Sequence, residues 1–143
     1  MNRRIALLMV PALLLGAAGL AIMYYQSTLA PADVTSTVNA LPAEISVAEA
    51  SQMKTDGAFM LDVRQPDEWT AVHMPGANLI PLDQLASRLS EVPQDTPIVV
   101  VCRSGNRSAQ GRDLLLQAGF TQVTSMAGGM NDWAATGLPT ESG

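Results

Sequence analysis

The sequence predicts an α/β fold: a doubly wound, mainly parallel sheet with helices on both faces, preceded by one N-terminal apolar helix. Three observations support this prediction: strand and helix patterns alternate after Ala43, Ile98–Val101 is an unbroken β-branched run, and residues 5–25 carry no charge. The 143 residues allow one domain beyond that apolar segment. With 13 Asp and Glu against 8 Lys and Arg, the chain shows no basic face of the kind that nucleic-acid binding requires.

The N-terminal segment, residues 1–25, has the pattern of a membrane anchor. Arg3 and Arg4 precede the uncharged stretch 5–25, and about 20 apolar residues cross a bilayer as a helix. Because the apolar core of a secretory signal usually has only about 7–15 residues, the length favours a transmembrane anchor. The alternative is a signal peptide that is cleaved near Ala32, where small residues fit a cleavage site.

Both interpretations put the rest of the chain on the same side of the membrane. Arg3 and Arg4 stay in the cytoplasm by the positive-inside rule. A bacterial protein of this sequence therefore has its domain in the periplasm, either anchored in the inner membrane or soluble after cleavage. Residues 26–43 are rich in Ser, Thr, Ala and Pro, which predicts a flexible linker. Residues 44–143 then form the domain.

The domain begins with two helices that flank a strand. Ser46 and Glu49 form a capping box, which predicts a helix over 46–54. The short apolar run 58–61 predicts a buried strand. A proline that fits the first helical turn predicts the second helix, over 67–72.

The middle of the domain alternates in the same way. Residues 73–76 have turn chemistry, and a brief apolar pair predicts a strand at 79–80. Three leucines at i, i+3 and i+7 predict an amphipathic helix over 82–89. The run 98–101 has no polar alternation, so we expect a strand that is buried on both faces.

The last part predicts two helices around one strand. A helix over 108–118 ends at Gly119, which fits the position just after a helix. The short run 123–125 predicts a strand. A pair of glycines then introduces a short helix over 128–133.

Cys102 follows the predicted strand 98–101 directly and is the only cysteine of the chain. Without a second cysteine it forms no internal disulfide, so it is a small buried residue, an intermolecular partner or a reactive thiol. In open α/β sheets the active crevice lies beyond the carboxyl ends of the strands. We therefore expect Cys102 at that edge.

The residues after Cys102 favour a reactive thiol. They are small or positively charged: Arg103, Ser104, Gly105, Asn106, Arg107 and Ser108. Tight turns of such residues point backbone N–H groups inward as an anion nest, and the N-terminus of the following helix adds partial positive charge. Arg112 adds a third nearby guanidinium. These features lower the pKa of a thiol and stabilise its thiolate. One Cys and one His are too few for zinc, and we expect no metal and no cofactor.

Three segments together resemble the single-domain rhodaneses, a family of sulfurtransferases. The loop CRSGNRS at 102–108 resembles the active-site loop of that family. The segment LDVRQPDEW at 61–69, followed by HMPGA at 73–77, is similar to its N-terminal signature. GGMNDW at 128–133 with GLP at 137–139 resembles its C-terminal signature.

The resemblance implies a rhodanese-like sheet of five strands and an enzyme similar to thiosulfate sulfurtransferase. The thiolate of Cys102 attacks the outer sulfur of a small anionic donor such as thiosulfate, a persulfide forms on Cys102, and a thiol, cyanide or a partner protein accepts the sulfur. Residues 103–108 bind the substrate, with Arg107 and Arg103 at the sulfonate end of the donor.

Four further residues in the matched segments are expected to support the site. The resemblance implies that Asp62 and Arg64 pair with neighbours and brace the edge of the sheet. The spacing of Arg64 and Glu68 fits an ion pair between the two. His73, the only histidine, fits a general base, but the family mechanism requires no base there, so a structural role is favoured.

Other functions stay open. Some phosphatases and arsenate reductases use a C-x5-R loop, and the C-x4-R loop from Cys102 to Arg107 is short for a phosphate group. The domain also fits a non-catalytic sulfur carrier or a partner-binding module. A thiol redox sensor would need a cysteine from another molecule.

We expect protease added to spheroplasts that express the full chain to cut the polypeptide after residue 25, because the positive-inside rule places that part outside the cytoplasm. The readout is the loss of the full-length band on an immunoblot, with a cytoplasmic marker as the intact control. A chain that survives in spheroplasts and is cut only after lysis would contradict the predicted location.

Overall fold

The computed structural model describes residues 40–143. The predicted anchor at 5–25, the possible cleavage site near Ala32 and most of the linker at 26–43 lie outside the described residues. Within residues 40–143, no helix is long and apolar enough to cross a membrane.

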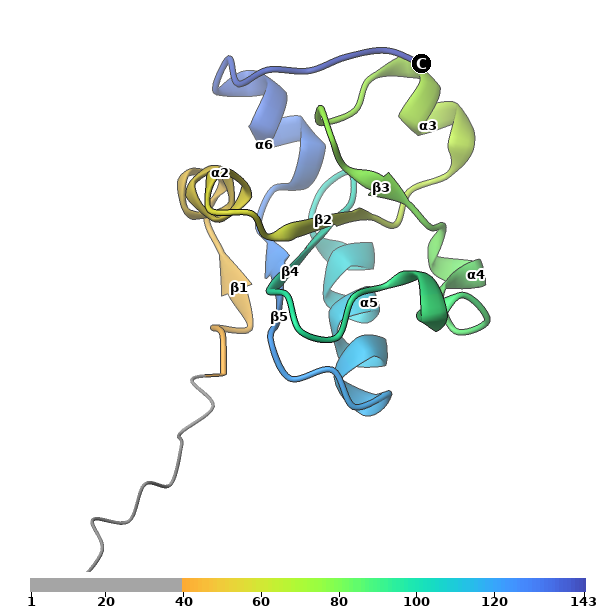
Figure 1. The fold of residues 1–143 in the computed structure, drawn as a ribbon. Coiled ribbons are helices and arrows are strands. Elements are labelled where there is room, and N and C mark those ends of the chain that lie inside the picture. Colours follow the sequence, from red (N-terminus) through yellow and green to blue (C-terminus); the bar gives the residue numbers. More distant parts are fainter. Residues whose placement is uncertain (1–39) are drawn as a thin grey trace, which may run out of the picture. The chain divides into compact units, whose positions relative to one another are not determined.

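One parallel sheet of five strands forms the centre of the domain, in the order β1-β5-β4-β2-β3 (Figure 1). The strands are β1 (Glu44–Ile45), β2 (Phe59–Asp62), β3 (Asn78–Leu79), β4 (Ile98–Val101) and β5 (Val123–Met126). The parallel α/β architecture predicted from the sequence is confirmed. The strand β4, which carries Cys102 at its end, lies in the middle of the sheet.

Helices connect the strands and cover both faces of the sheet. They are α2 (Val47–Thr55), α3 (Pro66–Ala71), α4 (Leu82–Leu85), the 3-10 helix η1 (Leu89–Glu91), α5 (Asn106–Gln117) and α6 (Gly129–Ala135). One hydrophobic cluster joins one face of the sheet to α4 and α5, and a second joins the other face to α2 and α6. Figure 1 shows α3 near the carboxyl end of β2, beside the chain that leads to β3.

The side chains of β4 explain its uninterrupted apolar sequence. Ile98 and Val100 pack in the cluster with Leu115 of α5, whereas Val99 and Val101 pack in the cluster with Trp133 of α6. A strand between two layers of helices has no solvent-facing side, so every position is apolar. The burial of each of these side chains contributes about 1.5–3 kcal/mol to the stability of the fold. Together these contacts fix the end of the strand and therefore the position of Cys102.

The predicted continuous helix over 82–89 is wrong. The chain leaves the α conformation at Arg88 (φ −119°, ψ 20°), and η1 follows. Ser87 donates its hydroxyl hydrogen to the backbone carbonyl three residues earlier, a local bond that competes with helix continuation. The leucine spacing still predicted the burial, because Leu82, Leu85 and Leu89 all contact the same core cluster.

The first turn of α6 packs directly on the segment that carries the thiol. The N–H of Met130 donates to the carbonyl of Cys102 at 2.8 Å, and the N–H of Asn131 donates to the carbonyl of Arg103 at 3.1 Å. Gly129 has a φ of +58°, and a Cβ there would collide with the Cys102 carbonyl oxygen and lie 2.6 Å from the carbonyl carbon of Arg103. Glycine at this position therefore permits the close approach of α6 to the loop.

We expect Gly129→Ala to lower the free energy of unfolding by about 2–4 kcal/mol, because it adds overpacking to backbone strain. Gly76→Ala is the matched control. Gly76 also has a positive φ, +72°, but a Cβ there would meet no atom within 4 Å. We therefore expect this substitution to lower the free energy of unfolding by only about 1–2 kcal/mol. Urea unfolding of the full chain, followed by tryptophan fluorescence, measures both. Equal costs for the two substitutions would show that the contact with the loop is unimportant.

Candidate functional site

The candidate site begins where β4 passes into α5. Cys102 follows the last residue of β4, and Gly105 caps α5 with a φ of +105°. The helix begins at Asn106, two residues before the predicted start at Ser108. The glycine therefore reverses the chain within a very short loop, which brings the first turn of α5 beside the thiol.

The thiol of Cys102 is enclosed by this turn, with only 1% of the residue exposed. The N–H of Gly105 donates to the sulfur at 3.1 Å. The thiol donates to the hydroxyl oxygen of Ser108 at 3.5 Å, and that hydroxyl donates to the carbonyl of Gly105 at 2.7 Å. Ser104 and Asn106 are exposed on the outside of the turn.

Two opposing effects act on the pKa of Cys102. Burial raises it, since a thiolate loses hydration, and hydrogen bonds lower it. Those bonds come from the Ser108 hydroxyl, which donates to the sulfur once the thiol has lost its proton, and from the backbone N–H groups of Ser108, Ser104 and Gly105. The hydrogen bonds outweigh burial, and the pKa of the thiol falls below its ordinary value. The loop therefore favours a thiolate in a place that excludes water.

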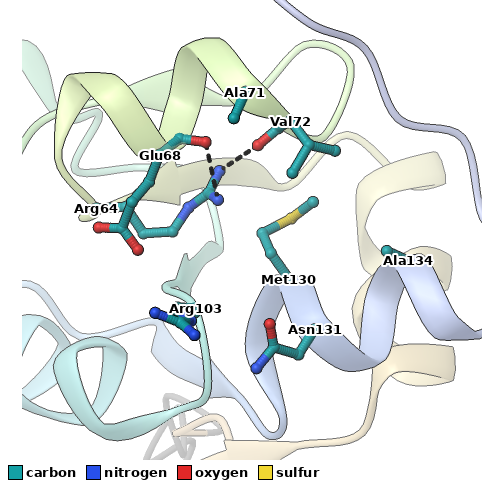
Figure 2. Close-up of a pocket in the computed structure, with 8 residues that line it drawn as sticks. All are labelled: Arg64, Glu68, Ala71, Val72, Arg103, Met130, Asn131 and Ala134. Atoms are coloured by element: carbon teal, nitrogen blue, oxygen red, sulfur yellow. Dashed lines mark hydrogen bonds between the residues drawn. The ribbon is translucent and has the colours of Figure 1, made fainter.

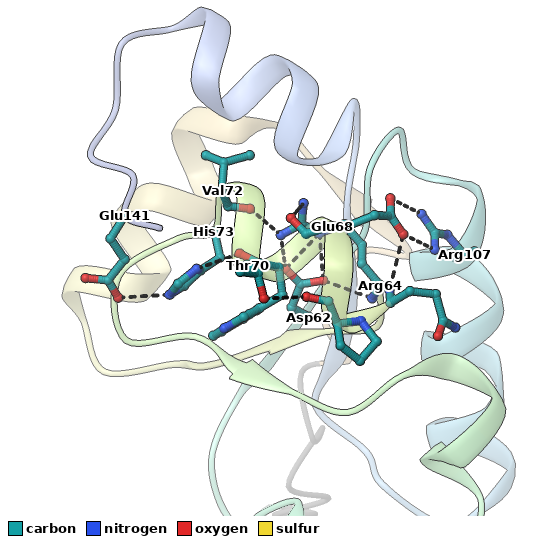
Figure 3. Close-up of polar contacts among 11 residues, drawn as sticks. Asp62, Arg64, Glu68, Thr70, Val72, His73, Arg107 and Glu141 are labelled. Carbon is teal, nitrogen blue, oxygen red and sulfur yellow. Dashed lines mark hydrogen bonds and ion pairs between the residues drawn. The ribbon is translucent and has the colours of Figure 1, made fainter. Parts of the chain in front are cut away.

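Arg107 is committed to an ion pair. Its guanidinium binds Glu68 of α3 through two bonds, Nη1 to Oε2 at 2.7 Å and Nη2 to Oε1 at 2.8 Å. The bonds from Arg107 hold the pKa of Glu68 at about 2. The same bonds from Glu68, with a smaller contribution from the charge on Cys102, raise the pKa of Arg107. Arg107 thus links α5 to α3 (Figure 3).

The predicted ion pair between Arg64 and Glu68 is wrong. Arg64 pairs with Asp62, with Nη2 to Oδ2 at 2.7 Å, and both side chains are buried. The remaining guanidinium hydrogens of Arg64 reach the backbone carbonyls of Glu68 and Val72. The helical spacing was misleading because the buried carboxylate at the end of β2 lies closer to Arg64 than the carboxylate of Glu68 does. Asp62 and Arg64 fix α3 to the end of β2.

His73 is fully occupied by structural contacts. Its ring stacks on Trp69 with a centroid distance of 3.8 Å. Nδ1 lies 2.9 Å from the carbonyl oxygen of Trp69, and Nε2 lies 3.2 Å from a carboxylate oxygen of Glu141. Its backbone also bonds Glu141 in both directions. Both ring nitrogens are thus engaged, and Figure 3 shows the contact of His73 with Glu141.

The three arginines of the predicted cluster have different environments. Arg107 is paired with Glu68. Arg112 binds Asp113 and the carbonyl of Ala43, so it supports the start of β1. Arg103 is exposed, and within residues 40–143 its guanidinium takes part in no ion pair. Only one of the three cations is therefore available to an anion beside the loop.

A cavity of about 400 Å³ lies next to Arg103, between α3 and α6 (Figure 2). Its lining residues are Arg64, Glu68, Ala71, Val72, Arg103, Met130, Asn131 and Ala134. The sequence indicated the two glycines as a helix start but gave no sign that Met130 and Asn131 contact the thiol loop. Within the described part of the chain, no group of three His, Cys, Asp or Glu residues is arranged to hold a metal.

Comparison with known proteins agrees with this architecture. The family model of the rhodanese-like domain matches residues 46–136. A protein named sulfurtransferase from Allochromatium vinosum is 38% identical over 85 residues, which cover 59% of this chain and 79% of the relative. Thiosulfate sulfurtransferase 16, chloroplastic, from Arabidopsis thaliana is 37% identical over 114 residues, which cover 71% of this chain and 95% of that protein.

A solved structure shows the same fold. The crystal structure of a rhodanese-related protein from Thermoplasma volcanium has a TM-score of 0.65 and 27% identity, and it covers 70% of this chain and 98% of its own. The sequence match includes β2, β4, α5 and α6, the elements that build the enclosed thiol. The chain belongs to the rhodanese-like domain family.

Proposed function

We propose that this protein is a sulfurtransferase that moves sulfane sulfur from an anionic donor such as thiosulfate to a thiophilic acceptor through a persulfide on Cys102. The observation that carries the proposal is the hydrogen bonding at the sulfur, where N–H and hydroxyl groups of the loop lower the pKa of a buried thiol. A buried cysteine without a reactive role needs no such set of donors.

The first half-reaction is a displacement at sulfur. The Cys102 thiolate attacks the outer sulfur of thiosulfate, a new S–S bond forms, the S–S bond of the donor breaks, and sulfite leaves with the electron pair. The negative charge moves from the cysteine sulfur to the outer sulfur of the persulfide. The N–H groups of the turn are already oriented inward and stabilise that charge without rearrangement.

The second half-reaction regenerates the thiolate. A nucleophile, either cyanide or a thiolate, attacks the outer sulfur of the persulfide, and the electron pair of the breaking bond returns to Cys102. No proton has to be transferred by a side chain in either displacement. The engagement of both His73 nitrogens in structural contacts is consistent with this mechanism.

In this proposal Arg107 does not bind the sulfonate end of the donor, in contrast to the role expected from the sequence. Its guanidinium is neutralised by a bidentate bond to Glu68, and a donor would have to displace a carboxylate whose pKa is about 2. Arg103 has no such competitor among residues 40–143 and faces the cavity. We therefore propose that Arg103 binds the sulfonate end of the donor and that Arg107 positions α3 against the loop.

Intact-mass spectrometry of the full chain after incubation with thiosulfate tests the proposed function. We expect the wild type to gain the mass of one sulfur atom and to lose it on addition of cyanide, because Cys102 is the only cysteine. Cys102→Ser should gain no mass. A wild-type chain that stays unmodified, or a variant that gains the same mass, would contradict the persulfide mechanism.

Ser108→Ala should raise the pKa of Cys102, because the hydroxyl is the largest of the influences that lower it. A thiol is ionised above its pKa, so the variant needs a higher pH to reach the same thiolate fraction. We expect alkylation by iodoacetamide at neutral pH to slow by about twofold to tenfold, with rates converging at high pH.

Ser104→Ala is the matched control for this measurement. Ser104 acts on the thiol through its backbone N–H, which the substitution keeps, so its alkylation curve should match the wild type. If the Cys102 thiol of Ser108→Ala has the same pKa as in the wild type, the hydroxyl does not stabilise the thiolate.

A further inference from the structure

Cys102 is closed to reactants in this conformation, because only 1% of the residue is exposed. Any reaction at its sulfur therefore requires part of the enclosure to move. Among the neighbouring elements, α3 has no buried residue, so polar contacts rather than core packing hold it in place. A helix held in this way can move while the hydrophobic core stays intact.

Residues 138–143, which we call the strap, run from α6 to α3 (Figure 1). The end of the strap that follows α6 is held firmly. Leu138 packs against the hydrophobic cluster between the sheet and α6. The indole N–H of Trp133 in α6 donates to the carbonyl of Pro139 at 2.9 Å. The first two residues of the strap are therefore fixed to α6.

The other end of the strap binds the chain on both sides of the α3 wall of the cavity. His73 and Glu141 bond to each other through both backbone N–H groups, at 2.8 and 2.9 Å, and their side chains form an ion pair at 3.2 Å (Figure 3). The N–H of Gly143 donates to the carbonyl of Thr70 at 3.1 Å. Thr70 and His73 flank residues 71–72, which line the cavity. The strap thus joins the two walls of the cavity.

The far part of the strap has the properties of a segment that opens easily. Residues 139–143 are all exposed. Beyond residue 139, within residues 40–143, three backbone hydrogen bonds and one ion pair are the polar contacts that hold the strap to α3 and to the turn after it. The carboxylate of that ion pair is half exposed, so the pair is weak. Segments with few buried apolar contacts and exposed hydrogen bonds open locally while the domain stays folded.

The helix that the strap holds is also connected to the turn around the thiol. Glu68 of α3 binds the guanidinium of Arg107 through two bonds, at 2.7 and 2.8 Å. Arg107 lies in the first turn of α5, next to the Gly105 N–H that donates to the sulfur. A movement of α3 is therefore passed on to the turn that encloses Cys102.

We propose that the strap is a gate that controls access to Cys102. Release of the strap from the end of α3 lets that helix turn about its remaining attachment to Arg64, and the ion pair with Arg107 passes the movement on to the turn around the sulfur. The gate acts on any reactant of Cys102, so this inference goes beyond the proposed sulfurtransferase function.

The test measures alkylation of Cys102 by iodoacetamide in the full chain, followed by intact mass, as a function of pH. Once the thiol is fully ionised the rate reaches a plateau, so the plateau reports access and the midpoint reports the pKa. Glu141→Pro removes the N–H that donates to His73. Thr140→Pro is the matched control, because the N–H of Thr140 donates to no backbone carbonyl of residues 40–143.

We expect Glu141→Pro to raise the plateau rate about threefold to tenfold without a change in the midpoint, because it increases the open population. Gly143→Pro removes the bond to Thr70 and should raise the plateau about twofold to fivefold. Thr140→Pro should keep the wild-type plateau. If both strap variants keep that plateau, or if Thr140→Pro raises it as much as Glu141→Pro does, the inference is wrong.

Urea separates opening of the gate from unfolding of the whole domain. Because the opening exposes little surface, the plateau rate of the wild type should change by less than about twofold per molar urea below the unfolding transition. A rate that rises with the full urea dependence of global unfolding would show that the sulfur is reached only in the unfolded chain, and the inference would fail.

The alkylation measurement does not depend on sulfur transfer. If Cys102 takes up no sulfur from thiosulfate, the proposed function fails, and alkylation alone decides whether the strap controls access. If Cys102 does take up sulfur, its loading in Glu141→Pro should accelerate together with its alkylation. Loading that stays at the wild-type rate would show that the donor reaches the sulfur without the gate, which contradicts the inference.

Discussion

The site depends on how the backbone of the short loop after Cys102 satisfies its hydrogen bonds. N–H groups that point inward at the sulfur require the neighbouring carbonyls to point outward, and buried carbonyls need donors of their own. The first turn of α6 provides two of them, through the N–H groups of Met130 and Asn131. The anion nest is therefore made by two helices: α5 donates to the sulfur, and α6 holds the loop in the conformation that allows it.

The ion pairs around the loop serve the same architecture. Asp62 and Arg64 are almost fully buried, and a buried charge is tolerated only when it is paired and hydrogen-bonded. Arg64 donates to the carbonyls of Glu68 and Val72 and so holds α3 over the end of β2, and the pair of Glu68 with Arg107 joins α3 to α5. Two arginines are used to fix α3, which leaves Arg103 as the cation in the cavity lining that has no ion pair among residues 40–143. The same ion pairs thus determine both the position of the α3 wall of the cavity and which arginine beside the cavity stays without an ion pair among the described residues.

Much of this arrangement could be predicted from the sequence because it is local. The apolar run Ile98–Val101 predicted a central strand, and the capping box at Ser46 and the helix end at Gly119 are present as expected. The features that the sequence did not predict are contacts between distant residues and strands that are too short to show a pattern. The partner of Arg107 lies 39 residues away, and β1 has only two residues, too few for a periodic pattern.

The position of Arg64 shows why spacing alone was insufficient for the site. A helical spacing of four residues predicts a contact only when both residues lie on the helix, and Arg64 precedes α3. Its guanidinium instead donates to the buried carboxylate of Asp62 at the end of β2. Which of two nearby carboxylates an arginine selects depends on burial, and burial is a property of the whole packed domain.

The near-complete enclosure of Cys102 makes the loop a steric filter. A bulky reactant such as the disulfide of a folded protein cannot reach the sulfur in this conformation of the turn, because only 1% of the residue is exposed. In an oxidising compartment such a filter would slow the formation of mixed disulfides with bulky partners.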